Sequence, residues 1–211
     1  MKKKNLNTTW KKLWYFIWEE NSIWSWVVNI VLAFILIKFI VYPGLGLALG
    51  TSYPIVAVVS NSMEHDSDFD SWWQNSEKYY AEFGIVKDSF EKFPLKKGFN
   101  KGDIIILWRA NPDNLKIGDV IVFRSSRTNP KPDPIIHRIV IKEEKEGKLI
   151  YQTKGDNYLT NRRQINTCFP DGCIYESDIQ QSQILGKALF KVPYLGYIKI
   201  WFVDLLNFFI K

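Results

Sequence analysis

The chain has 211 residues, enough to bury the core of one domain with attachments, and 46% of them are hydrophobic, which excludes an intrinsically disordered protein. Aromatic residues make up 16%, with 9 Trp, a residue that favours the boundary between membrane and water. The net charge of +6 suits nucleic acid or an anionic membrane surface, so the positions of the basic residues must decide between them.

An apolar stretch, IWSWVVNIVLAFILIKFIVY, occupies residues 23–42, and only Asn29 and Lys38 in it are strongly polar. As a helix it would span roughly 30 Å, the thickness of a bilayer core. A cleavable signal peptide would have a shorter apolar region nearer the start, so we expect an uncleaved transmembrane anchor over 23–43. The lysines of residues 1–22 predict a cytoplasmic N-terminus, which makes nucleic acid an unfavoured partner. We therefore expect a single-pass protein of the cell membrane whose remaining chain is extracytoplasmic.

The next segments change character several times. Residues 44–50 (GLGLALG) predict a hinge of small residues, and 53–60 (YPIVAVVS) predict a β-strand. The stretch 64–100 is acidic, then aromatic, then rich in lysine, which we interpret as an insertion or lid between strands. A short helix is expected within it at 72–83.

From residue 101 onward, alternating apolar residues predict a series of strands. They are expected at 102–110, 118–126, 135–144 and 148–156, with two shorter strands near 174–175 and 186–192. Glu146 to Lys148 predicts a hairpin turn, and Pro130, Pro132 and Pro134 predict a loop. The predicted fold is one mostly-β extracytoplasmic domain over 51–195, on an N-terminal transmembrane helix.

The C-terminal segment 196–211 is apolar, but Lys199 and Asp204 interrupt it. Its helical part is about 15 residues, short of a full membrane span, so either a thin membrane helix or a helix in the interface is expected. We favour the interfacial helix, with four aromatic anchors: Trp201, Phe202, Phe208 and Phe209.

Cys168 and Cys173 enclose Phe-Pro-Asp-Gly, a sequence that favours a turn. An extracytoplasmic location permits a disulfide, which we favour over two free thiols.

Three residues could carry hydrolytic chemistry, although each is ordinary by itself. Ser62 directly follows a predicted strand, His137 lies in the middle of one, and Asp156 sits in a Gly-Asp-Asn turn at the end of another. A serine protease needs a hydroxyl, a base for its proton and a group that orients the base.

The combination resembles signal peptidase I, specifically the branch of archaea and the endoplasmic reticulum. The resemblance runs from residue 23 to about residue 200. It rests on motifs in the family's order, in which SNSM resembles the serine box, IIHRIV the base box and TKGDN the acid box. KGDIIIL and IGDVIVF resemble the core strands, and GKALFKVPYLGYIKI the closing segment.

The resemblance implies a serine endopeptidase that removes signal peptides from exported preproteins. Ser62 would attack the scissile carbonyl, His137 would be the general base and Asp156 would orient it. The Ser62 N–H and the Ser60 hydroxyl would form the oxyanion hole. No cofactor or metal is implied, and the expected partners are preproteins, the lipid bilayer and the protein-export machinery.

Three features depart from the family. His65 stands where proline is frequent, the insertion 64–100 is long, and the positions of a second acid after Gly-Asp-Asn hold Asn161 and Arg162. Asp178 or Asp171 could therefore supply the acid instead of Asp156.

Other interpretations stay open. His65 could be the base, and the acidic run that it begins could bind calcium, although the glycine and glutamate of a calcium loop are missing. The main alternative function is a catalytically inactive, membrane-tethered β-rich binding protein of the same fold. A repressor-type protease would need a lysine base and a DNA-binding domain, and neither is evident.

Overall fold

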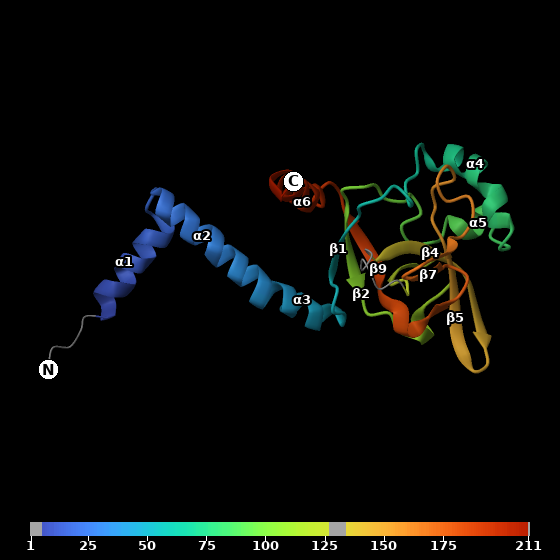
Figure 1. The fold of residues 1–211 in the computed structure, drawn as a ribbon, viewed down its shortest axis with the longest axis horizontal. Helices are drawn as coiled ribbons and strands as arrows, with labels where there is room; N and C mark the ends of the chain where they lie inside the picture. Colours follow the sequence, from blue (N-terminus) through green and yellow to red (C-terminus); the bar gives the residue numbers. More distant parts are fainter. Residues whose placement is uncertain (1–5, 127–133, 211) are drawn as a thin grey trace. The chain divides into compact units, whose positions relative to one another are not determined.

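The computed structural model describes residues 6–126 and 134–210, so the predicted loop prolines Pro130 and Pro132 lie outside the described residues. The chain forms two compact units, Met1–Ala48 and Leu49–Lys211, and each is described by itself. Figure 1 shows the helical N-terminal elements and the β-rich remainder of the chain.

The N-terminal helices are α1 (Leu6–Trp18), α2 (Ile23–Leu36), the π-helix η1 (Ile37–Val41) and α3 (Tyr42–Leu49). The Ser22 hydroxyl caps α2 by accepting from the Ser25 N–H at 3.2 Å. Among the described residues, one continuous helix, Ile23–Leu49, is long and apolar enough to cross a membrane. The predicted hinge at 44–50 is wrong, because the helix continues to Leu49. Pro43 comes directly after the π-helical turn, and a local π adjustment can re-satisfy a backbone group that a proline leaves without a partner.

The second unit is built on antiparallel strands, which confirms the mostly-β prediction. Their bounds are β1 (Ile55–Ala57), β2 (Ile104–Trp108), β3 (Val120–Phe123), β4 (Ile135–Lys145), β5 (Lys148–Lys154), β6 (Asn166–Phe169), β7 (Gly172–Tyr175), β8 (Ile179–Gln180) and β9 (Ile184–Val192). Seven form one sheet in the order β1-β2-β9-β3-β4-β5-β8, and β6 and β7 form a separate hairpin. Cys168 and Cys173 are joined by a disulfide across that hairpin.

The main core lies between the strands and the segment that follows β1. Ile105, Leu107, Val120 and Val122 from β2 and β3 are fully buried with Met63. Each such side chain contributes about 1.5–3 kcal/mol through its removal from water. The core therefore binds the segment around residue 63 to the sheet.

The insertion 64–100 contains α4 (Phe69–Ala81) and α5 (Lys87–Phe90) beside the sheet (Figure 1). Asp68 caps α4 by accepting from the N–H groups of the next turn at 3.1 Å. Trp72, Tyr80 and Phe90 are fully buried in one cluster with Val140 of β4. The insertion is thus an integral packed layer, and the predicted helix at 72–83 appears a few residues earlier.

The last described element is α6 (Tyr197–Ile210). Two 3-10 turns lie earlier in the chain, η2 (Pro112–Asn114) and η3 (Gln181–Gln183). The Gly196 N–H donates to the Gly102 carbonyl at 2.8 Å. Three of the expected aromatic anchors, Trp201, Phe202 and Phe208, are exposed, and the Phe209 side chain lies outside the described residues.

Candidate active site

Ser62 lies in the turn that follows β1, and its side chain is partly exposed. Its Oγ lies 3.2 Å from the Ser60 Oγ. A cavity of about 480 Å³ is lined by residues 56–62, by 134–137 from the start of β4, and by Thr160, Asn161 and Ile165. The structure therefore brings three predicted site residues, Ser60, Ser62 and His137, to one cavity.

The turn at 155–157 holds the serine in place through its backbone. The Asn157 N–H donates to the Ser62 carbonyl at 2.9 Å, and the Asn157 amide donates to the Asn61 carbonyl at 2.9 Å. Gly155 packs so closely that a Cβ there would lie 2.7 Å from the Ser62 carbonyl oxygen. The Gly-Asp-Asn motif thus contacts the serine loop through its backbone. The first residue of the motif must be a glycine, because a side chain there would collide with that loop.

His137 is a buried residue of β4, paired with Ile121 of β3, and only 2% of its side chain is exposed. Its Nδ1 is in hydrogen-bond contact with Oε1 of Glu176. Among the described residues, the Ser62 Oγ contacts Ser60 rather than His137. The predicted nucleophile and the predicted base thus share the cavity without a direct hydrogen bond in this structure.

Glu176 was not predicted from the sequence. Its carboxylate is fully buried and accepts from the Thr153 hydroxyl at 2.9 Å and from the Ile165 N–H at 2.5 Å. The available signal was an acid directly after the predicted short strand at 174–175.

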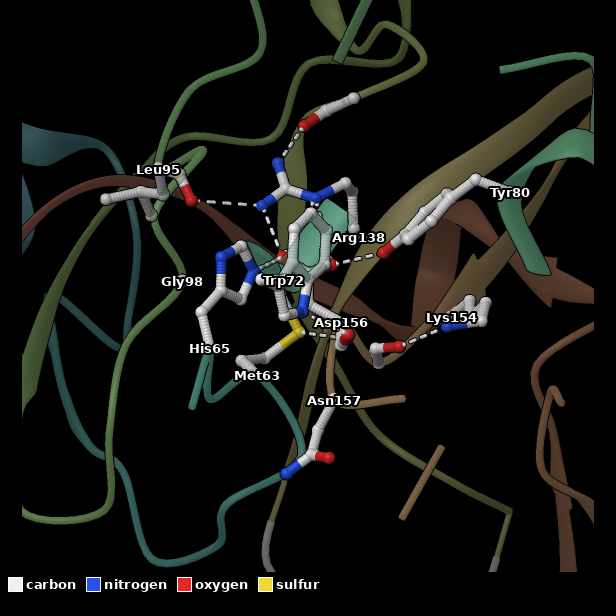
Figure 2. A network of polar contacts seen from close by, with 12 residues as sticks. Met63, His65, Trp72, Tyr80, Leu95, Gly98, Arg138, Lys154, Asp156 and Asn157 are labelled. Atoms are coloured by element: carbon white, nitrogen blue, oxygen red, sulfur yellow. Dashed lines mark hydrogen bonds and ion pairs between the residues drawn. The ribbon is translucent and has the colours of Figure 1, made fainter. Parts of the chain in front are cut away.

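Asp156 does not make the contact expected of it. Arg138 donates to both of its carboxylate oxygens, at 3.0 Å from Nε to Oδ1 and 2.6 Å from Nη2 to Oδ2. The Tyr80 hydroxyl donates to Oδ1 at 2.6 Å, and His65 Nε2 lies 3.2 Å from Oδ2 (Figure 2). The Asp156 carboxylate is therefore engaged with Arg138, Tyr80 and His65, and the structure shows Glu176, not Asp156, against His137.

The electrostatics of this network follow from its burial. Burial alone would raise the pKa of Asp156, but the charge of Arg138 and the hydrogen bonds from His65 and Arg138 outweigh it and hold that pKa well below its usual range. Burial and the charge of Asp156 raise the pKa of Tyr80, which keeps its hydroxyl a donor. Asp156 is thus a permanent anion at neutral pH, paired with a permanent cation.

Two of the three alternative residues, Asp178 and His65, have other contacts. Asp178 is exposed and lines a separate cavity with residues of the β4–β5 turn. His65 is buried, stacks on Trp72 at 3.6 Å between ring centroids and faces Asp156. Neither arrangement gives His137 an acid or Ser62 a second base.

The acidic run after His65 is explained by local structure. The Tyr158 hydroxyl donates to Asp66 at 2.6 Å, Asp68 caps α4, and Asp70 pairs with Lys87 at 2.6 Å. Within residues 6–126 and 134–210, no group of three or more His, Cys, Asp or Glu is placed to hold a metal ion.

No protein-family profile matches the chain. It is similar to the signal peptidase complex catalytic subunit SEC11 of Lachancea thermotolerans, with 30% identity over 165 residues, 77% of this chain and 74% of that protein. The corresponding proteins of Sclerotinia sclerotiorum and Zygosaccharomyces rouxii are each 28% identical, over 77% of this chain and 71% and 74% of their own lengths. With the mostly-β fold and the serine–histidine cavity, this similarity confirms the expected family: the chain belongs to the signal peptidase I family of serine endopeptidases, in the branch of archaea and the endoplasmic reticulum.

Proposed function

We propose that this chain hydrolyses the peptide bond after a signal peptide by means of Ser62 and His137. The Ser62 Oγ attacks the scissile carbonyl carbon while the His137 Nε2 accepts the hydroxyl proton. His137 then donates that proton to the leaving amine, and a water molecule hydrolyses the acyl-enzyme by the same steps. The observation that carries this proposal is that both side chains line one cavity at the end of β1.

The charge that develops on the attacked carbonyl oxygen needs donors. The Ser62 N–H lies in a turn, where no backbone hydrogen bond occupies it among the described residues, and the Ser60 hydroxyl is 3.2 Å from the nucleophile. Two donors placed where the oxyanion forms stabilise the transition state more than the substrate. This pair therefore fits the role of the oxyanion hole.

The substrate is best accommodated as an extended peptide. β1 is an edge strand of the sheet, with β2 on one side only, and residues 56–59 of this segment line the cavity next to Ser62. A free strand edge can pair with an extended chain through its backbone. Preproteins with small side chains before the cleavage site are the proposed substrate class.

The proposed location follows from the N-terminal helix. Lysines precede Ile23–Leu49, so the N-terminus would be cytoplasmic and the β domain extracytoplasmic, on a single-pass anchor in the cell membrane. Because the named relatives are subunits of a complex, partner proteins of the export machinery are proposed for this chain as well.

The test is cleavage of a preprotein with a small-x-small site by the full-length protein in detergent or lipid. Ser62→Ala and His137→Ala should each abolish processing while the circular dichroism spectrum of the β domain is unchanged. If both variants cut as wild type does, this assignment of the chemistry is wrong. If wild type and both variants are folded but inactive on every preprotein tested, the inactive binding protein is the better reading.

A further inference from the structure

The carboxylate of Glu176 is fully buried, so the groups that contact it must explain why it is there. Its side chain has no exposed area, and a carboxylate without partners in such a place would be strongly destabilising. Three donors surround it: the His137 ring, the Thr153 hydroxyl and the Ile165 N–H. Two of the three fix its position, and the third is the predicted catalytic base.

The position of Glu176 is set by the fold rather than by a flexible side chain. The Thr153 N–H donates to the Glu176 carbonyl at 2.9 Å, and the Glu176 N–H donates to the Ile165 carbonyl at 2.9 Å. The Gln164 amide spans the carbonyls of Thr153 and Glu176, at 2.9 and 3.2 Å. The residue therefore sits between β5 and the base of the β6–β7 hairpin, directly beside β4.

The contact determines which ring nitrogen carries the proton. An ionised carboxylate can only accept, so the His137 Nδ1 must be the N–H donor toward Glu176. In the neutral ring the Nε2 then has the free lone pair, which a general base requires. His137 also lines the cavity with Ser62, so the same ring meets the acid on one side and the reaction space on the other.

We propose that Glu176 is the positioning residue for His137, in the role that the family resemblance implied for Asp156. It holds the ring in the Nδ1–H tautomer and stabilises the imidazolium that forms during each proton transfer. Asp156, paired with Arg138, instead supports the serine loop, because its backbone N–H donates to the Met63 Sδ at 3.4 Å. This inference rests on the proposed function, because it gives Glu176 a role only if His137 is the base.

The first test uses the unmodified protein and nitrogen-15 labelled histidine. The chain has 2 histidines, so the spectrum of His137→Ala assigns the ring signals of His137 by difference. At about pH 8, where an ordinary imidazole is neutral, His137 must be protonated at Nδ1. A ring protonated at Nε2 would overturn the proposal whatever the variants do.

The second test is Glu176→Gln, which keeps the size and removes the charge. The amide can donate to Nδ1 and so favours the wrong tautomer, which should lower kcat by on the order of 10²- to 10⁴-fold on a peptide with a small-x-small site. KM should stay close to the wild-type value, and the Nδ1–H signal of His137 should disappear. Glu176→Asp, which keeps the charge, should recover part of the lost kcat.

Asp178→Asn is the matched control, because it removes an exposed acid from the same segment, and it should leave kcat and the His137 signals unchanged. A wild-type kcat in Glu176→Gln would refute the role of Glu176. If Ser62→Ala and His137→Ala are inactive at the same time, the proposed function stands and only the positioning residue is wrong. If those two variants are active, the proposed function itself fails.

Discussion

Arg138 and Asp156 form an ion pair in which neither side chain has any exposed area, directly beside the turn that holds Ser62. Arg138 also donates to the carbonyls of Pro94, Leu95 and Gly118 at 2.8–3.0 Å. The pair therefore joins β4, the acid-box turn and the insertion at one point.

Asp156→Asn should destabilise the protein strongly, because it leaves the buried guanidinium without its counter-charge. Breaking such a pair on one side costs about 3–5 kcal/mol. Chemical denaturation of the full chain in detergent, followed by tryptophan fluorescence, measures it. Asp70→Asn is the control, since water screens the exposed Asp70–Lys87 pair and its loss should change the free energy of unfolding little. Equal losses in the two variants would contradict the structural role of Asp156.

Gly155→Ala should displace the nucleophile. The new Cβ would lie 2.7 Å from the Ser62 carbonyl oxygen, so the serine loop must move, and a shift of about 1 Å can cost about 10²-fold in rate. Cleavage rate is the measurement. Gly147→Ala, in the turn before the same strand, meets nothing within 4 Å and should keep its activity despite a φ of +73°. Unimpaired cleavage by Gly155→Ala would show that the turn does not position Ser62.

Ser60→Ala should lower kcat by about 10²–10³-fold if its hydroxyl completes the oxyanion hole. The side chain is exposed, so folding should be unaffected. Steady-state kinetics on a preprotein peptide report the change, with the exposed Ser52→Ala as the control. If kcat is unchanged and only KM rises, Ser60 acts in substrate binding instead.

Lys154 predicts a pH dependence of stability. Burial lowers the pKa of its ammonium group to about 8, although the charges of Asp156 and Glu176 oppose this. The unfolded chain keeps that proton up to about pH 10.4, so it binds more protons than the folded chain between about pH 8 and 10.4, and stability rises with pH in that window. Lys154→Met removes the dependence. The free energy of unfolding of wild type should therefore rise by up to about 3 kcal/mol relative to that of Lys154→Met across the window.

Denaturation curves at several pH values test this, with Lys148→Met at the exposed start of β5 as the control. The idea is wrong if the difference in the free energy of unfolding between wild type and Lys154→Met is the same at pH 7 and pH 10.

The Cys168–Cys173 disulfide should support the acid that faces His137. It closes the hairpin whose base pairs Ile165 with Glu176, and a short loop of this kind contributes about 2 kcal/mol in the chain-entropy account. Cys168→Ser with Cys173→Ser should lower both thermal stability and kcat. A reductant should impair wild type in the same way and leave the double variant unchanged. If fully reduced wild type keeps its kcat, the hairpin does not support the acid that faces His137.

Local pattern was sufficient for much of the fold. The alternation of apolar residues predicted 135–144 and 148–156, close to β4 and β5, although residues 136–140 of β4 are all buried. It did not predict β8, since two residues carry no periodicity, and the small residues 44–50 suggested a hinge where neighbouring helical turns keep the helix intact.

By itself, the sequence determined the apolar N-terminal helix and the β-rich domain. It also predicted two of the proposed site residues, Ser62 and His137, because their motifs stand in the order of the family, although each residue is ordinary alone. Only the tertiary structure decided their third partner. Glu176 is 39 residues from His137, and the two meet because β5 pairs with β4 and the hairpin base returns beside Thr153. Asp156 lies closer in sequence, but successive side chains of a strand point to opposite faces, and it meets Arg138, the neighbour of His137 on the other side of β4.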